Sequence, residues 1–166
     1  GYTVGVLVQT NHGGILQIDG LELGTVLGDY FLKKDIELNS EGSCMVVVAT
    51  DAPLDSRNLK RLAKRALLGI ARTGGFYSNA SGDYAIAFST AKELRIPNHS
   101  SSLTQQMTIL RNDQMSPLFL AAAEATEEAI LNSLFKAQTM EGKDGHIVQA
   151  LPLEKLKEIM PREQKK

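Results

Sequence analysis

Two short apolar runs limit the folds open to this chain more than any other feature of its sequence. Residues 2–10 (YTVGVLVQT) and residues 44–49 (CMVVVA) are rich in β-branched side chains, and their apolar residues stand at nearly consecutive positions. Runs of this length and composition are typical of strands buried on both faces, because a half-exposed strand alternates apolar with polar residues. We therefore expect two strands in a sheet that other elements cover on both sides.

A helix and a third strand are predicted to follow the second run. Within residues 57–70, basic side chains recur at i, i+3, i+4, i+7 and i+8 opposite an apolar stripe, and Gly74-Gly75 comes directly afterwards. This pattern predicts one amphipathic helix with a glycine C-cap. Residues 84–89 (YAIAFS) predict a third strand. Periodicity alone gives only strands followed by helices, and the fold that we expect from them is α/β, with sheets buried beneath helices.

A hairpin is predicted near the N-terminus. Residues 15–18 and 21–23 flank the dipeptide Asp19-Gly20, which is a strong signal for a type I′ turn because both central residues of that turn need a positive φ. Residues 24–41 then lose any sustained periodicity. We expect this segment to be an exposed loop.

Two further helices are predicted in the C-terminal half. Residues 116–140 have apolar side chains on roughly one face, with Ser116 as the expected N-cap and Pro117 as the first helical residue. Residues 151–160 predict a short helix that Pro152 opens. The length of the first of these helices indicates a packing element.

Composition narrows the functional classes. The 166 residues suit a single domain, and we treat residues 1–166 as one domain portion. Eighteen basic and nineteen acidic residues leave a formal net charge of −1, so the chain lacks the positive field that attracts nucleic acid or an anionic membrane. No stretch approaches the roughly 18 consecutive apolar residues that cross a bilayer. We expect no nucleic-acid or membrane partner and a cytoplasmic location, with any signal peptide outside this chain.

Several common kinds of site are excluded by spacing. His12, His99 and His146 lie far apart in the sequence, and the single cysteine, Cys44, has no spaced partner, so we expect no metal site and no disulfide. No glycine-rich loop joins a strand to a helix start, which excludes the usual nucleotide fingerprints. No serine stands in a G-x-S-x-G turn, which argues against a Ser-His-Asp hydrolase of that type.

The dipeptide Gly42-Ser43 remains as a candidate for chemistry. It stands between the predicted loop and a predicted strand, so the serine hydroxyl is held rigidly while the preceding peptide bond keeps its freedom. Attack of Ser43 on the Gly42 carbonyl would turn the amide into an ester, and water would then release Ser43 as a new N-terminus. The free α-amine, with a reference pKa of about 7.7–8.0, suits a base for that hydroxyl. Spacing alone leaves a purely structural Gly-Ser open as the alternative.

Three segments, in the same order along the chain, carry a family resemblance: GSCMVVVATDAPL, RNLKRLAKRALLGIARTGG and SGDYAIAFST. They resemble the β-subunit of the DmpA-like family of self-processing aminopeptidases, which includes the L-aminopeptidase/D-esterases and the β-peptidyl aminopeptidases. The segment YTVGVLVQTNHGG resembles the end of that family's α-subunit. The resemblance implies the four-layer αββα sandwich of the DmpA and ornithine acetyltransferase type, which lies within the α/β class.

The resemblance also implies an activity. The chain would be cleaved between Gly42 and Ser43, which makes residues 1–42 the end of an α-subunit and residues 43–166 the β-subunit. Ser43 matches the nucleophile of the family. The implied enzyme needs no cofactor and no metal, and it releases N-terminal residues from short peptides, amides or esters through an acyl-enzyme.

Three other residues match functional positions of the family. Asn11 matches an asparagine whose carboxamide stabilises the oxyanion, and Ser81 and Asp83 match a serine and an acid that orient the nucleophile and its amine. Ser81 and Asp83 point to one face if their backbone is extended. The acid is the longer Glu in some relatives, so Asp83 needs a closer backbone or a bridging water. From the residues alone, an Asn that forms a turn and a Ser-Gly-Asp turn remain open.

The implied partners come from outside this chain. Family members carry a large N-terminal portion ahead of the strand at residues 2–10, with further residues of the substrate pocket. We expect this remaining α-subunit portion as a partner, together with a homo-oligomer of αβ pairs. Cys44 is not expected to attack substrate, because strand alternation turns its thiol away from the side of Ser43.

Two other functions stay open. Ornithine acetyltransferases resemble this architecture and also cleave themselves, but they use threonine where this chain has Ser43. Acetyl transfer from acetylornithine to glutamate would identify that activity. The second alternative is a non-catalytic binding or assembly domain, because half a substrate pocket seldom catalyses; an uncleaved intact mass would favour it.

Overall fold

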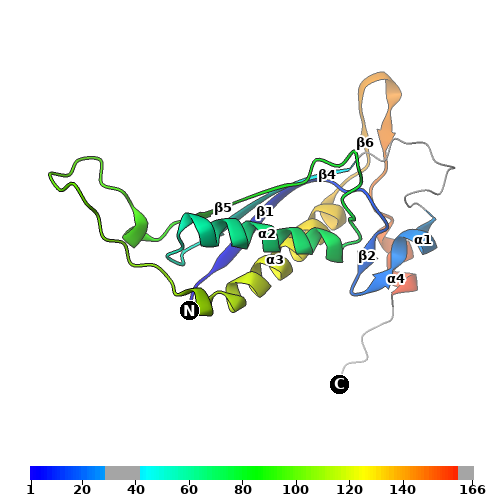
Figure 1. The fold of residues 1–166 in the computed structure, drawn as a ribbon. Coiled ribbons are helices and arrows are strands. Elements are labelled where there is room, and N and C mark those ends of the chain that lie inside the picture. The colour runs from blue at the N-terminus through cyan, green and yellow to red at the C-terminus, as the bar shows by residue number, and fades with distance from the viewer. Residues whose placement is uncertain (29–41, 161–166) are drawn as a thin grey trace.

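A three-stranded mixed sheet forms the centre of the structure, a computed structural model that describes residues 1–28 and 42–160 (Figure 1). Its strands are β1 (Val4–Asn11), β4 (Ser43–Thr50) and β5 (Tyr84–Ser89), in the spatial order β1-β4-β5. β1 runs antiparallel to β4, whereas β5 runs parallel to it. All three strands lie where the sequence predicts them, and β4 is paired along both of its edges.

Two helices cover one face of this sheet (Figure 1). α2 (Ser56–Arg72) connects β4 to β5, as parallel neighbours require a crossover. It packs against these two strands, while α3 (Ser116–Lys136) packs against β1 and against α2. The predicted α/β class is confirmed.

The start and the buried stripe of α2 follow from its sequence. The Asp55 carboxylate accepts a hydrogen bond from the backbone N–H of Asn58 at 2.8 Å, which satisfies one of the free donors at the helix start. Leu62, Ala66 and Ile70 form the stripe that faces the sheet and are buried. The basic side chains of α2 are exposed or half-buried, as the periodicity predicts.

The ends of α3 differ from the prediction. The cap position is Met115 rather than Ser116, and no side chain caps the helix. The Met115 side chain is only 1% exposed, so packing fixes this end of the helix instead of a polar cap. Pro117 lies in the first turn, where a backbone N–H has no partner within the helix, so its missing N–H costs no hydrogen bond. The helix stops before the predicted end at Met140, because the residue after Lys136 is already extended.

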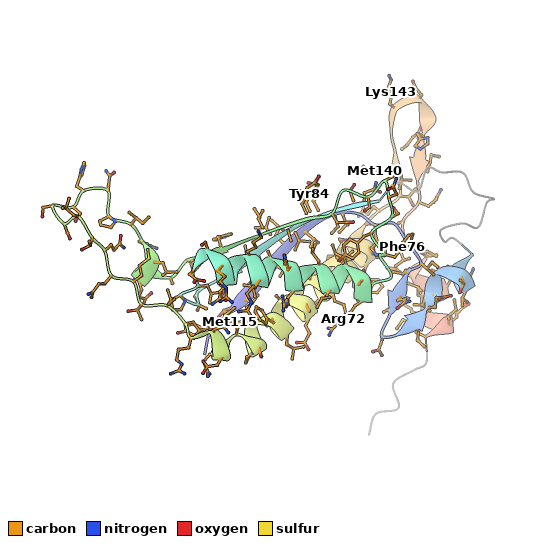
Figure 2. All side chains as sticks on the ribbon, in the orientation of Figure 1. Arg72, Phe76, Tyr84, Met115, Met140 and Lys143 are labelled. Atoms are coloured by element: carbon orange, nitrogen blue, oxygen red, sulfur yellow. The ribbon has the colours of Figure 1, made fainter. Side chains whose placement is uncertain are left out.

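The prediction that the strands are buried on both faces is wrong for the described residues. Cys44 and Val48 point toward the helices and are buried, but Leu7 on the opposite face is 72% exposed. The described residues provide helices on one side of the sheet only. We call the other side the open sheet face; its large exposed apolar side chains are Leu7, Met45, Tyr84, Ile86 and Phe88. Figure 2 shows Tyr84 projecting away from the helices. The other two layers of an αββα sandwich stay a prediction.

The predicted hairpin is confirmed by β2 (Gln17–Ile18) and β3 (Leu21–Glu22). Asp19 and Gly20 between them have φ values of 51° and 72°, as a type I′ turn requires. The predicted loop that follows is wrong at its start, because α1 (Leu23–Leu27) forms a short helix there. Residues 29–41 of that prediction lie outside the described residues.

Smaller elements complete the described chain. The predicted helix at residues 151–160 is confirmed as α4 (Leu153–Ile159), with Pro152 in the cap position. Leu156 of α4 packs with Ile18 and Leu23 in a second, smaller core. Within the described ranges, none of the helices combines the length and the apolar character needed to cross a bilayer. The remaining elements are 3₁₀ helices at Lys92–Leu94, Asn112–Gln114 and Lys143–Gly145 and the strands β6 (Met140–Glu141) and β7 (Ile147–Val148).

Candidate active site

Ser43 is the first residue of β4, and its hydroxyl lies against the peptide group that precedes it. Ser43 Oγ donates a hydrogen bond to the carbonyl oxygen of the buried Gly42 at 2.6 Å. The backbone N–H of Gly82 donates to Ser43 Oγ at 3.3 Å and to the Gly42 carbonyl oxygen, also at 3.3 Å. The candidate nucleophile and the candidate scissile carbonyl therefore share one hydrogen-bonded cluster.

Asn11 is brought to this cluster by the sheet. It is the last residue of β1 and lies directly opposite Ser43 in the antiparallel register. Residues paired in this way point to the same face, with Cβ atoms about 4.5–5.5 Å apart. The Asn11 side chain is exposed there. The structure thus places a carboxamide beside the Ser43 side chain.

Ser81 and Asp83 lie just before β5, beside the start of β4. Ser81 Oγ donates a hydrogen bond to Asp83 Oδ2 at 2.6 Å. The two side chains therefore face the same way, as their spacing predicts, and they bond directly to each other. A Cβ built on Gly42 would lie 3.6 Å from Ser81 Oγ, so Ser81 stands close to the candidate cleavage site.

Gly42 suits its position because the surrounding backbone is close. A Cβ at this residue would come within 3.2 Å of the Cα of Gly13, in the turn after β1, and within 3.4 Å of its nitrogen. Such contacts are tighter than most real Cβ contacts, and the neighbour here is backbone rather than a flexible side chain. Glycine therefore lets the two segments approach each other.

All the candidate residues line one small cavity of about 20 Å³. A site that holds a water molecule needs roughly 10–15 Å³, so this cavity has room for about one water. The predicted residues in its lining are Asn11, Gly42, Ser43, Ser81 and Asp83.

His12 also lines the cavity, a position that sequence reasoning missed because it considered this residue only as a metal ligand. His12 Nε2 lies 3.0 Å from Thr73 Oγ1. The Thr73 hydroxyl donates its proton to the carbonyl oxygen of Ile70, so Nε2 is the donor in this pair. Burial lowers the pKa of His12, although a hydrogen bond to the backbone of Thr73 and the nearby Asp83 oppose the shift. The sequence signal that could have identified His12 as a site residue is its position next to Asn11.

Two more groups, one beside Ser43 and one in the lining of the cavity, lacked a sequence signal. The N–H of Gly82 is a backbone group, which no residue type marks. Tyr77 donates its hydroxyl to the carbonyl oxygen of Leu67. Burial, with Asp83 and Cys44 adding to it, raises the pKa of Tyr77 to about 12, so its hydroxyl stays protonated near neutral pH.

Cys44 faces the other way from Ser43, as strand alternation predicts. It is 4% exposed and belongs to the core beneath the helices. Burial, with a smaller contribution from Asp83, raises the pKa of its thiol to about 11. A buried and protonated thiol is a poor nucleophile. Among the described residues, no group of three His, Cys, Asp or Glu side chains is placed to hold a metal ion.

Comparisons with known proteins assign this chain to a family. The model of peptidase family S58 matches residues 1–148. The β-peptidyl aminopeptidase BapA of Sphingosinicella microcystinivorans is 39% identical over 174 residues, an alignment that covers 97% of this chain and 43% of that protein. The chain thus spans less than half the length of the curated relatives it matches.

Solved structures resemble the described fold closely. The PH0078 protein from Pyrococcus horikoshii OT3 is 47% identical with a TM-score of 0.80, over 95% of this chain and 42% of that one. The L-aminopeptidase D-Ala-esterase/amidase from Ochrobactrum anthropi is 37% identical with a TM-score of 0.81, over 95% of this chain and 43% of that one. It is described as a prototype of the serine aminopeptidases with a new variant of the Ntn-hydrolase fold. From its sequence and its fold alike, this chain belongs to peptidase family S58.

Proposed function

We propose that this chain is part of a self-processing serine aminopeptidase that cleaves its own bond between Gly42 and Ser43. Ser43 would then serve as an N-terminal nucleophile that releases N-terminal residues from short peptides, amides or esters. The observation that carries the proposal is the cluster around Ser43 Oγ, which lies 2.6 Å from the Gly42 carbonyl oxygen and bonds to the Gly82 N–H. Membership of family S58 supports a peptidase over an acetyltransferase.

Self-cleavage needs only the chain itself and one water molecule. Ser43 Oγ bonds to the Gly42 carbonyl carbon, the peptide C–N bond breaks, and the hydroxyl proton ends on the departing nitrogen. The product is an ester between Gly42 and Ser43 with a free α-amine on Ser43. Water then hydrolyses the ester, which leaves a carboxylate on Gly42 and restores the hydroxyl. The new amine has an ordinary pKa of about 7.7–8.0 and can take the hydroxyl proton in later turnovers.

The other candidate residues receive roles from their positions. Asn11, opposite Ser43, would donate its amide N–H to the oxyanion that forms on the attacked carbonyl. The bonded pair Ser81 and Asp83 would orient the nucleophile, and the Asp83 carboxylate would hold the protonated α-amine after cleavage. All three line the same cavity as Ser43, which supports these assignments.

The open sheet face supports a further portion of the protein as a partner. Its apolar side chains, with Leu7 72% exposed and Ile86 62% exposed, form a surface of the kind that normally packs against another layer. We propose that the remaining α-subunit portion supplies a second sheet here and completes the αββα sandwich and the substrate pocket. We also propose assembly into homo-oligomers of αβ pairs and a cytoplasmic location.

Activity of the full-length protein tests the proposal. We expect hydrolysis of short peptides with a free N-terminus and loss of this activity when the same peptides are N-acetylated. Ser43→Ala should abolish turnover, while Ser43→Thr keeps a hydroxyl and should retain part of it. Acetyl transfer from acetylornithine to glutamate, with no peptide hydrolysis, would contradict the aminopeptidase and identify the acetyltransferase. Absence of both activities would favour a binding domain.

A further inference from the structure

We propose that the backbone N–H of Gly82 is a catalytic hydrogen-bond donor for self-cleavage, which stabilises the oxyanion that forms on the Gly42 carbonyl. This inference rests on the proposed function. The distinctive observation is that one N–H lies 3.3 Å from both reacting oxygens, the hydroxyl of Ser43 and the carbonyl oxygen of Gly42.

The sheet places this donor. β5 runs parallel to β4 with Tyr84 paired to Met45, and extending this register by two residues, to just before β5, brings Gly82 beside Ser43. In a parallel ladder, the N–H of such a residue points to the carbonyl oxygen that precedes its partner, which here is that of Gly42. The donor is therefore fixed by the strand pairing that holds the core together, and it needs no rearrangement before the reaction.

The length of the two bonds fits a donor that acts during the reaction. A hydrogen bond of 3.3 Å is longer than the usual 2.9–3.0 Å, and sharing one proton between two acceptors weakens each bond further. When Ser43 Oγ bonds to the carbonyl carbon, the carbonyl oxygen gains negative charge and becomes a much stronger acceptor than Ser43 Oγ. The Gly82 N–H then has one strong acceptor, so the interaction is stronger in the transition state than in the starting state.

Ser81 and Asp83 hold the peptide group that carries this N–H. Their side chains bond to each other at 2.6 Å across Gly82, which closes a small ring around it. This bond restrains the backbone on both sides of Gly82. Ser81 and Asp83 thus act in the precursor as positioning residues, in addition to their proposed role after cleavage.

Removal of this N–H alone tests the proposal in the full-length protein. Glycolic acid in place of Gly82, introduced by semisynthesis, turns the amide into an ester and deletes only the donor. The matched control is glycolic acid in place of the exposed Gly142, which deletes a backbone hydrogen bond of the same kind, from the Gly142 N–H to the His146 carbonyl oxygen at 2.7 Å, outside the site. Sarcosine at position 82 removes the same N–H by methylation and replaces the ester variant if that variant does not fold.

The readout is the rate of the acyl shift, followed by mass with excess hydroxylamine to trap the ester as it forms. Loss of one oxyanion donor typically slows a reaction about 100- to 1000-fold, and we expect this loss for the ester at position 82 but not for the ester at position 142. Thermal unfolding shows whether each variant is folded. A folded ester variant that cleaves within about threefold of the parent would overturn the inference and leave the proposed function intact. A parent that does not cleave would refute the proposed function, and this inference with it.

Discussion

Asn11→Ala should remove most of the activity and leave the fold nearly unchanged. Loss of one side-chain donor at an oxyanion typically costs about 2.7–4 kcal/mol of transition-state stabilisation, or about 100- to 1000-fold in rate. The cost to stability should be small, because the Asn11 side chain is exposed at the end of a strand. Surface substitutions of this kind usually stay within about 0.5 kcal/mol. For a domain of this size that is a change in Tm of roughly 1–2 °C.

The assay compares kcat/KM on an aminoacyl p-nitroanilide with the extent of self-cleavage on a gel. Gln9→Ala is the matched control, because Gln9 is exposed on the same face of β1 two residues earlier and lies opposite Met45 rather than Ser43. Asn11→Asp, which keeps the size but replaces the donor with a negative charge, should be at least as inactive as Asn11→Ala. If Asn11→Ala matches Gln9→Ala in both measurements, Asn11 does not stabilise the oxyanion.

Three further predictions concern stability and pH. A Cβ on Gly69 would lie 2.6 Å from the carbonyl oxygen of Ala123 in α3, so Gly69→Ala should lower the free energy of unfolding by about 1–3 kcal/mol in urea titrations, whereas Gly5→Ala, with nothing within 4 Å, should not. Because the raised pKa of Cys44 makes the folded state hold its proton more tightly, stability should fall as the pH rises from about 9 to about 11. Cys44→Ala should flatten this part of the stability profile. An unchanged slope would mean that the Cys44 thiol does not cause the loss of stability. Burial lowers the pKa of His12, so stability should fall as the pH drops below its ordinary value of 6.5; in His12→Gln this acid loss should shrink, and its persistence would mean that another group causes it.

Local sequence patterns predicted the elements that carry the site. The strands, the basic helix and the Asp19-Gly20 turn each depend on residues near in sequence, and the structure places them as predicted. Cys44 illustrates this, since alternation predicted that its thiol points away from the side of Ser43, and the structure places it in the core. The ends of α3 were less predictable, because packing of the Met115 side chain fixes its start and outweighs the preference of serine for a cap.

Local sequence patterns could not predict which residues, far apart in the sequence, lie together in the structure. The family resemblance, and not the spacing, first assigned Asn11 and Ser43 to one site. In the structure, the register of two antiparallel strands pairs them directly. The donor at Gly82 is a backbone group, so only the pairing of β4 with β5 reveals it. The apolar runs did predict burial on both faces, but the cover of the open sheet face is not provided by the described residues. Its apolar side chains fit the prediction of a further layer.

The identity of the chain ends in the purified full-length protein tests the central claim most directly. Intact mass and N-terminal sequencing should find two polypeptides, one of which begins Ser-Cys-Met at Ser43, while the Ser43→Ala protein remains one chain of full mass. A protein that stays uncleaved and still hydrolyses short peptides at the full rate would contradict the account.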